Sequence, residues 1–304
     1  MSDAAPIELL LDAPGAPTAR PVPTALFRLG TVLVVLSLVL MAAGPYLAPW
    51  DVGRPSDEIA VPPPALEEVP ELLWAVMTGA PHEPVHWFGT DAAGLDVFSR
   101  VLAAPRTDVA IAVGANLLSL MLGSLLGLFA GTARPLLAGL LMRVSDLVQA
   151  FPVFITGMIL ATLAGRSNWT IALTLALLYT PIYIRLTRAE VLAQRRRGFV
   201  DAARALGRRE GAIALAHVLP NALAPALIQA SVTVGFAILM TAGLSFVGAG
   251  VRPPTPEWGL MIAAGADQIV QGEWWPSLFP GLAISLTVFG YAAFGNGLGR
   301  YHAG

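Results

Sequence analysis

Six long stretches without Asp, Glu, Lys or Arg divide this 304-residue chain. They cover residues 29–50, 109–133, 147–165, 167–184, 211–251 and 274–299. Each reaches the roughly 18 residues that a helix needs to cross a bilayer. Charged residues make up 12% of the chain, whereas soluble domains carry about 25%. The sequence therefore predicts an all-α polytopic membrane protein with six transmembrane helices.

The stretch 211–251 is too long for one span, because an α-helix rises about 1.5 Å per residue. Its first ten residues are expected outside the bilayer, and the span is expected to begin near Ala222. Pro220 lies at that boundary and is expected to end the preceding helix. The first stretch is too long for a signal peptide, so we expect it to remain as an anchor.

The chain divides into four predicted segments. Residues 1–25 are rich in Pro and Ala and are expected to form a disordered cytoplasmic tail, and 26–50 form the first transmembrane helix. Residues 51–106 form an acidic, Pro-rich outer segment with a short helix near 65–77. Residues 107–300 form a core of five further transmembrane helices, with a cytoplasmic loop over 186–221.

The distribution of arginine predicts the orientation of the chain. All 18 basic residues are arginine, and with a cytoplasmic N-terminus thirteen of them fall on the cytoplasmic side. Cytoplasmic loops of membrane proteins carry such an excess of positive charge. Five tryptophans gather near the predicted outer ends of spans, as interfacial residues do: Trp50, Trp169, Trp258, Trp274 and Trp275. Both termini and the loop 186–221 are therefore predicted to be cytoplasmic.

The cytoplasmic loop has the pattern of two short helices. Its apolar residues recur at spacings of three and four, which predicts one apolar helix face made of Phe199, Val200, Ala203 and Leu206. Gly207 is the expected left-handed cap, and a second helix is expected from about 210 to 219. Ala202, Ala203 and Ala205 present small side chains. The pattern alone leaves two interpretations open, a helix resting on anionic lipid and an element that docks another protein.

Several motifs resemble one family. "DAARALG" (201–207) followed by "HVLPN" (217–221) resembles the cytoplasmic loop of bacterial ABC importer permeases. "HWFGTDAAGLDVFSRVL" (86–102), "DLVQAFPVF" (146–154), "RLTRAEVLAQRRRGFVDAARALG" (185–207) and "LSFVGAGVRPPTPEWGLMI" (244–262) are similar to the dipeptide, oligopeptide and nickel permease family, on its C-type half. The resemblance covers roughly residues 27–300 and favours the docking interpretation.

The resemblance implies a type I ABC importer permease fold whose cytoplasmic loop, the coupling loop, contacts an ATPase. The expected coupling-loop residues are Phe199, Asp201, Ala202, Ala203, Leu206, Gly207, His217, Pro220 and Asn221. The expected outer-face motif consists of Gly89, Thr90, Asp91, Gly94 and Asp96. The implied partners are the bilayer of the bacterial inner membrane, a second homologous permease chain, one or two ATPase subunits and an extracytoplasmic substrate-binding protein. Nucleic acid is not among them.

The chain is not expected to be an enzyme. A P-loop needs a lysine, and the sequence contains none, so ATP and Mg are expected on a partner chain. Transport driven by protons or sodium generally uses ionisable groups within spans, and the six stretches have none. No cofactor or metal is expected in this chain: the lone His217 is interpreted as structural, and Asp91 as the side chain that forms a turn.

The substrate path and the substrate stay open. Asn116, Thr156, Thr233, Thr241 and Ser245 are possible path-lining residues, although polar side chains in spans equally often join helices. The small residues Gly114, Gly123 and Gly127 predict one close-packed helix face.

The sequence also departs from the family pattern at Leu95, Ala104, Pro105, Thr241 and 295–300. Short peptides are the default substrate, with a nickel or other metal chelate as the alternative. A membrane scaffold or receptor that recruits a cytoplasmic partner is the alternative of another functional class.

Overall fold

A computed structural model of the chain describes residues 24–80 and 85–303, and nearly all of the predicted tail 1–25 lies outside them. The helices are α1 Thr24–Leu47, α2 Val69–Thr78, α3 Val97–Ala103, α4 Pro105–Thr132, α5 Pro135–Gln149, α6 Val153–Leu163, α7 Asn168–Gln194, α8 Gly198–Ala205, α9 Glu210–Ile213, the π-helix η2 Ala214–Val218, α10 Leu219–Ala222, α11 Ala224–Phe246, α12 Trp258–Ala266, the 3-10 helix η3 Ile269–Gln271 and α13 Trp275–Ala303. Among the described residues the only β-pairing is an isolated bridge between Thr90 and Asp96.

Five helical segments are long and apolar enough to cross a bilayer. They are Ala25–Leu47, Val97–Thr132, Asn168–Gln194, Ala224–Phe246 and Trp275–Gly299. The sixth candidate is the pair α5 and α6, which passes the same test only as one span bent by 87°. The prediction of an all-α polytopic membrane protein is confirmed, with five candidate spans and a sixth that is bent.

The straight third span that the sequence predicted over 147–165 is wrong. α5 ends at Gln149 and α6 starts at Val153, with Pro152 as its N-cap residue. A proline disfavours helical backbone at the residue before it, here Phe151. Three residues between the two helices therefore leave the helical path, and the chain turns there.

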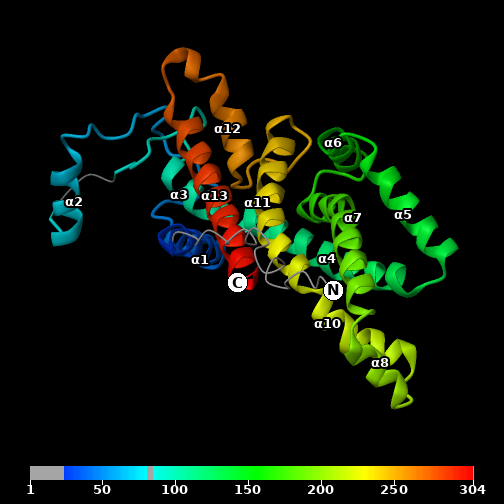
Figure 1. Cartoon of the computed structure of the whole chain (residues 1–304). Helices are drawn as coiled ribbons and strands as arrows, with labels where there is room; N and C mark the ends of the chain where they lie inside the picture. Colours follow the sequence, from blue (N-terminus) through cyan, green and yellow to red (C-terminus); the bar gives the residue numbers. More distant parts are fainter. Residues whose placement is uncertain (1–23, 81–84, 304) are drawn as a thin grey trace, which may run out of the picture.

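The spans pack around α4, α7, α11 and α13 (Figure 1). α4 lies along α7, α11 contacts both α4 and α13, and α1 packs on α13. α12 packs against α11 and α13 at one end of the molecule, and α8 lies at the opposite end (Figure 1). α5 and α6 lie on one side, far from α1. The short helix expected near 65–77 is α2, which projects from the molecule and buries none of its residues.

A row of glycines lets α4 approach α7 closely. A Cβ at Gly123 would lie 2.7 Å from the Thr180 carbonyl oxygen, and a Cβ at Gly127 would lie 2.8 Å from that of Ile184. Gly131 continues the row, since a Cβ there would lie 2.5 Å from a methyl group of Val191. The close-packed face predicted from the sequence is thus present, but its members are 123, 127 and 131. Gly114, the third predicted member, has no neighbour within 4 Å of a Cβ.

Candidate functional site

α8 forms the first half of the coupling loop, and the predicted helix over 198–206 is present as Gly198–Ala205. The four apolar residues do not share one face as predicted. Val200 and Ala203 are buried, whereas Phe199 is 39% exposed and Leu206 is 83% exposed. The reason is that only one side of this short helix faces the spans. Ala202 and Ala205 are exposed with Asp201, while Ala203 packs inward, so the alanine surface is narrower than expected.

Gly207 ends α8 with the predicted left-handed cap. Its φ is +74°, a conformation that side chains rarely adopt. The Gly207 N–H donates to the Arg204 carbonyl (2.8 Å), and the Arg208 N–H donates to that of Ala203 (3.2 Å). These two bonds are the Schellman pattern, which satisfies the last carbonyls of a helix. The turn after α8 therefore has a defined backbone conformation.

Arg204 fastens α8 to the helix that follows. Its guanidinium donates to Asp201 (2.9 Å) and to Glu210 (2.7 Å), the first residue of α9. Arg204 and Glu210 were not among the predicted site residues. Their signal in the sequence is a pair of opposite charges on either side of the capping glycine.

The buried side of α8 is anchored on the ends of two spans. Val200 and Ala203 belong to a buried apolar cluster with Leu128 of α4 and Val191 of α7. The cluster is completed by Ile213, Val218 and Ala222. Arg195, directly after α7, donates to the Gly131 carbonyl of α4 (2.8 Å). α8 is thus bound to α4 and α7 together.

The second half of the coupling loop does not stop at Pro220, and that prediction is wrong. The helix continues through α9, the π-helix η2 and α10, and it breaks only at Leu223. Leu219 N–H donates to the Ala214 carbonyl, five residues back. A π-turn placed directly before a proline lets the chain continue past a residue that has no N–H to donate. The expected start of the next span near Ala222 is close to the observed start of α11 at Ala224.

The remaining predicted residues of this loop lie on the same continuous helix. The Asn221 amide donates to the carbonyl of His217 (2.6 Å), so it closes the last turn of the loop. His217 is half-buried on η2. The structural role assigned to its imidazole stays a prediction.

The outer-face motif forms a compact turn between α2 and α3. As predicted, Asp91 forms the turn: its carboxylate accepts from the N–H groups of Ala93 and Leu95, both at 2.9 Å. Gly89 has a φ of +73°, and a Cβ there would overlap the Val61 carbonyl oxygen. Thr90 accepts from the Val61 N–H (2.9 Å). Gly94 accepts at its carbonyl oxygen from the Ser56 N–H (2.8 Å).

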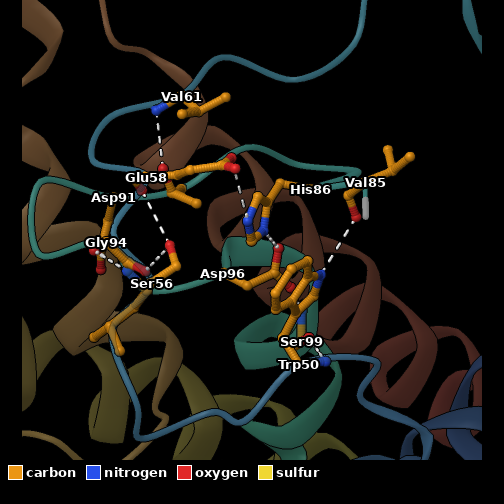
Figure 2. Close-up of polar contacts among 12 residues, drawn as sticks. Trp50, Ser56, Glu58, Val61, Val85, His86, Asp91, Gly94, Asp96 and Ser99 are labelled. Atoms are coloured by element: carbon orange, nitrogen blue, oxygen red, sulfur yellow. Dashed lines mark hydrogen bonds and ion pairs between the residues drawn. The ribbon is translucent and has the colours of Figure 1, made fainter. Parts of the chain in front are cut away.

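Asp96 links this turn to a buried histidine, as Figure 2 shows. Its Oδ1 lies 2.7 Å from Nδ1 of His86, and its Oδ2 accepts from the Ser99 N–H (2.7 Å), which caps α3. Trp50 stacks on the imidazole with ring centroids 4.2 Å apart. Glu58 lies 3.7 Å from Nε2 of His86. His86, Trp50 and Glu58 were missed from the sequence, because only the fold brings residues 50, 58 and 86 together.

Asp96→Ala is expected to destabilise the protein by about 3 kcal/mol, because it removes a helix cap and the partner of a buried imidazole. Asp51→Ala is the matched control: Asp51 also accepts a backbone hydrogen bond, from Gly53 (2.9 Å), but it is exposed. We expect it to change stability by less than about 0.5 kcal/mol. Thermal unfolding of the two purified variants measures the difference, and equal midpoints would show that the buried pair contributes nothing.

Of the predicted path-lining residues, Asn116 has hydrogen bonds to two other helices. Asn116 donates to the Ala230 carbonyl of α11 (3.1 Å) and accepts from the Tyr183 hydroxyl of α7. The hydroxyls of Thr156, Thr233 and Thr241 each donate to a carbonyl of their own chain four residues earlier. Ser245 accepts from the Val251 N–H (3.2 Å). The Asn116 bonds fit the alternative role of joining helices, whereas the three threonine bonds are local to one helix. The role of these residues in a path stays a prediction.

Arg100 is another functional candidate that the sequence did not single out. It was counted as an outer-loop charge, but it is buried, and its guanidinium donates to the carbonyls of Val52 (2.7 Å) and Pro254 (3.1 Å). Arg100 therefore joins the outer segment to the loop before α12. These two parts of the chain are far apart in the sequence, so their contact could not be predicted from residue spacing.

Comparison with known proteins identifies the family. Residues 123–301 match the family described as "Binding-protein-dependent transport system inner membrane component". The chain is 35% identical over 267 residues to the "Probable D,D-dipeptide transport system permease protein DdpC" of Escherichia coli (strain K12). The aligned residues make up 88% of this chain and 83% of that protein. It is 38% identical over 213 residues to the "Dipeptide transport system permease protein DppC" of Alkalihalophilus pseudofirmus, covering 70% of each.

A third relative extends over a similar length. The "Di/tripeptide transport system permease protein DppC" of Pseudomonas aeruginosa is 34% identical over 271 residues, which is 89% of this chain and 85% of that protein. The family match begins within α4 and spans α5, α6, α7, the coupling loop, α11, α12 and most of α13. This chain belongs to the family of inner-membrane components of binding-protein-dependent transport systems, as a multi-pass permease subunit.

Proposed function

We propose that this chain is a permease subunit of an ATP-driven importer of short peptides, and that α8 is the helix through which an ATPase subunit moves it. The observation that carries this proposal is the construction of α8. The helix is capped at Gly207, tied to α9 by Arg204, and anchored on α4 and α7 through Val200 and Ala203. A helix held in this way transmits a displacement to the spans, whereas a flexible loop would absorb it.

The surface of α8 fits a protein groove better than a lipid surface. Arg204 is the one cation within Gly198–Ala205 and is already bound to Asp201 and Glu210. The exposed arginines of the coupling loop lie outside the helix, at Arg196, Arg197, Arg208 and Arg209. Phe199 and the C-cap residue Leu206 expose apolar side chains beside Ala202, Ala205 and Asp201. Exposed apolar side chains on a small-residue surface are typical of a contact that another protein covers.

The ATPase is a separate chain in this proposal, because the sequence contains no lysine for a P-loop. ATP and Mg bind to that partner, in one or two copies. The α8 end faces the cytoplasm, as the arginine distribution predicts, and both termini lie on that side. The opposite end, with the outer-face motif and α12, then receives the extracytoplasmic substrate-binding protein.

The α5–α6 bend supports a second homologous permease chain as a further partner. Ala150, Phe151 and Pro152 are exposed and lie outside helical structure at the bend. Non-helical backbone at membrane depth is stable only where protein or a water-filled cavity surrounds it. α5 buries only Ala138 and Ser145 against this chain, so a partner helix has room to cover the bend.

Short peptides are the proposed substrate because the three relatives are named for dipeptide or di/tripeptide transport. A nickel or other metal chelate is the competing substrate class. Reconstitution with the co-purified subunits distinguishes the two classes. We expect short peptides, added with a binding protein, to stimulate ATP hydrolysis. Stimulation by a metal chelate and not by peptides would overturn the substrate assignment.

Leu206→Glu tests the docking surface. Leu206 is 83% exposed next to the cap, and a carboxylate there is expected to release the ATPase subunit because an apolar contact would have to bury a charge. Leu66→Glu is the control, since Leu66 is 89% exposed on the outer segment. Co-purification of the ATPase with each variant is measured. Equal recovery from both variants would contradict docking at α8.

The scaffold or receptor alternative makes a different prediction. A scaffold would bind its cytoplasmic partner through the coupling loop without moving a solute. Vesicles that contain the complete complex, ATP and a binding protein are therefore expected to accumulate peptide. ATPase binding without accumulation would favour the scaffold.

A further inference from the structure

Two carboxyl groups from distant parts of the sequence meet inside the protein near the outer-face motif. Asp108 lies in the first turn of α4, and Glu257 directly precedes α12. Both side chains have no exposed surface, the N–H of Trp258, the residue after Glu257, donates to Asp108 (3.1 Å), and the two carboxyl groups interact directly. Asp108 lies one residue before the charge-free stretch 109–133, and nothing in the sequence pattern indicates that it is buried.

Glu257 is surrounded by hydrogen-bond donors. Its carboxylate accepts from the N–H groups of Gly259 (3.1 Å) and Leu260 (2.6 Å), which makes it the N-cap of α12. Burial raises the pKa of the Glu257 carboxyl, and hydrogen bonds from Asp108, Leu260, Gly259 and Ser245 act in the opposite direction. The start of a helix favours a negative charge, so Glu257 is the member of the pair that is suited to be ionised.

Asp108 is poor in donors. Its Oδ2 accepts from the Trp258 N–H (3.1 Å), and its Oδ1 is buried and accepts no hydrogen bond from an N–H or O–H group. The group that remains beside it is the Glu257 carboxylate, which can only accept. Two neighbouring carboxyl groups in a buried site repel each other when both are ionised, so one of them is expected to carry a proton, and Asp108, which has fewer hydrogen-bond donors, is the better candidate.

The neighbouring cations do not neutralise the pair. Arg100 is occupied by the carbonyls of Val52 and Pro254, and Arg106 and Arg252 are exposed. α11 and α12 contain no charged residue, and α13 contains none before Arg300. No ion pair within residues 24–80 and 85–299 includes Asp108 or Glu257.

The pair lies in a seam between α3–α4 and the start of α12. Trp258 Nε1 donates to the Val101 carbonyl (3.2 Å), and its backbone N–H donates to Asp108. Arg100 donates to Pro254 in the same seam. Three contacts therefore hold the start of α12 against α3 and α4, and the carboxyl pair is the part of the seam that depends on a proton.

We propose that Asp108 and Glu257 share one proton, held on Asp108, and that this proton fastens α12 to α4. Loss of the proton places two negative charges side by side in a buried site, which drives the start of α12 away from α4. Because the closed seam holds the proton more tightly than an open seam does, the contact is intact at lower pH and is lost as the pH rises. The inference concerns the seam alone and does not rest on the proposed function.

Infrared difference spectra of the full-length chain test where the proton lies. At neutral pH we expect the wild type to show the carbonyl band of a protonated carboxylic acid and Asp108→Asn to lack it. In Glu257→Gln the band is expected to remain but to disappear at a lower pH than in the wild type, because the neighbouring negative charge is gone. A band that is unchanged in Asp108→Asn would overturn the proposal.

Backbone amide exchange over α12 tests the fastening. Asp108→Asn keeps a neutral donor and the acceptor for Trp258, so exchange is expected to match the wild type. Asp108→Leu is expected to speed exchange by about tenfold, because a buried hydrogen-bonding group is removed. Thr107→Val is the control, because valine has nearly the same shape as threonine and Thr107 is the adjacent buried residue. Amide exchange over α12 is expected to stay close to the wild-type rate in this variant. Equal exchange in the Asn and Leu variants would show that the pair does not hold α12.

Neither the infrared nor the exchange experiment uses a substrate or an ATPase, so a negative result in either leaves the proposed function untouched.

Discussion

Gly207→Pro is expected to abolish substrate uptake while the chain still inserts into the membrane. Proline fixes φ near −65° and has no N–H, whereas Gly207 has a φ of +74° and donates to Arg204. Such a conflict costs about 3 kcal/mol or more, which lowers the population of the native turn by about a hundredfold. Uptake into vesicles and ATP hydrolysis by the purified complex are measured, and we expect hydrolysis to continue without uptake.

Gly198→Pro is the matched control at the other end of α8. Gly198 is the first residue of the helix, where proline is favoured, and a Cβ there has no neighbour within 4 Å. The preceding Arg197 has an extended backbone (φ −86°, ψ 146°), as a residue before proline prefers. This variant is expected to transport normally. Normal uptake by Gly207→Pro as well would show that the cap does not matter for coupling.

Gly127→Ala is expected to destabilise the protein by about 3 kcal/mol, because the added Cβ would lie 2.8 Å from both the Ile184 carbonyl oxygen and the Thr187 Cβ. Both neighbours belong to the packed face of α7, and backbone cannot move aside there without separating the two spans. The temperature at which the detergent-purified chain unfolds and the amount recovered from membranes are the measurements.

Gly114→Ala provides the comparison within the same helix. A Cβ at Gly114 meets nothing within 4 Å, so the change is expected to alter stability by less than about 0.5 kcal/mol. If the two alanine variants unfold at the same temperature, the glycine row is not what sets the distance between α4 and α7.

Features encoded by neighbouring residues could be predicted from the sequence. The apolar stretches gave five of the spans, since length and composition alone decide whether a helix can cross a bilayer. α8 and its cap followed from the apolar spacing and Gly207, and the Asp91 turn followed from local side-chain chemistry. In each case the interaction joins residues within about one helical turn of each other.

Features that depend on tertiary contacts could not be predicted. Trp258 and Trp275 were interpreted as interfacial, but both are buried, and the Trp275 indole donates to the Thr90 carbonyl (2.9 Å). Asp108 and Glu257 meet only because the first residue of α12, Trp258, lies against the first turn of α4. Gly114 and Gly127 look alike in the sequence, and only the position of α7 separates them. The passage of the helix beyond Pro220 depends on a π-turn that has no simple sequence pattern.

The shared attachment of α8 to α4 and α7 has a mechanical consequence. Because the glycine row brings α4 into close contact with α7, we expect these two helices to move together. Asn116 connects this pair of helices to α11 through the Ala230 carbonyl. Under the proposed function, a push applied at α8, a helix of eight residues, is expected to reorient α4, α7 and α11 together.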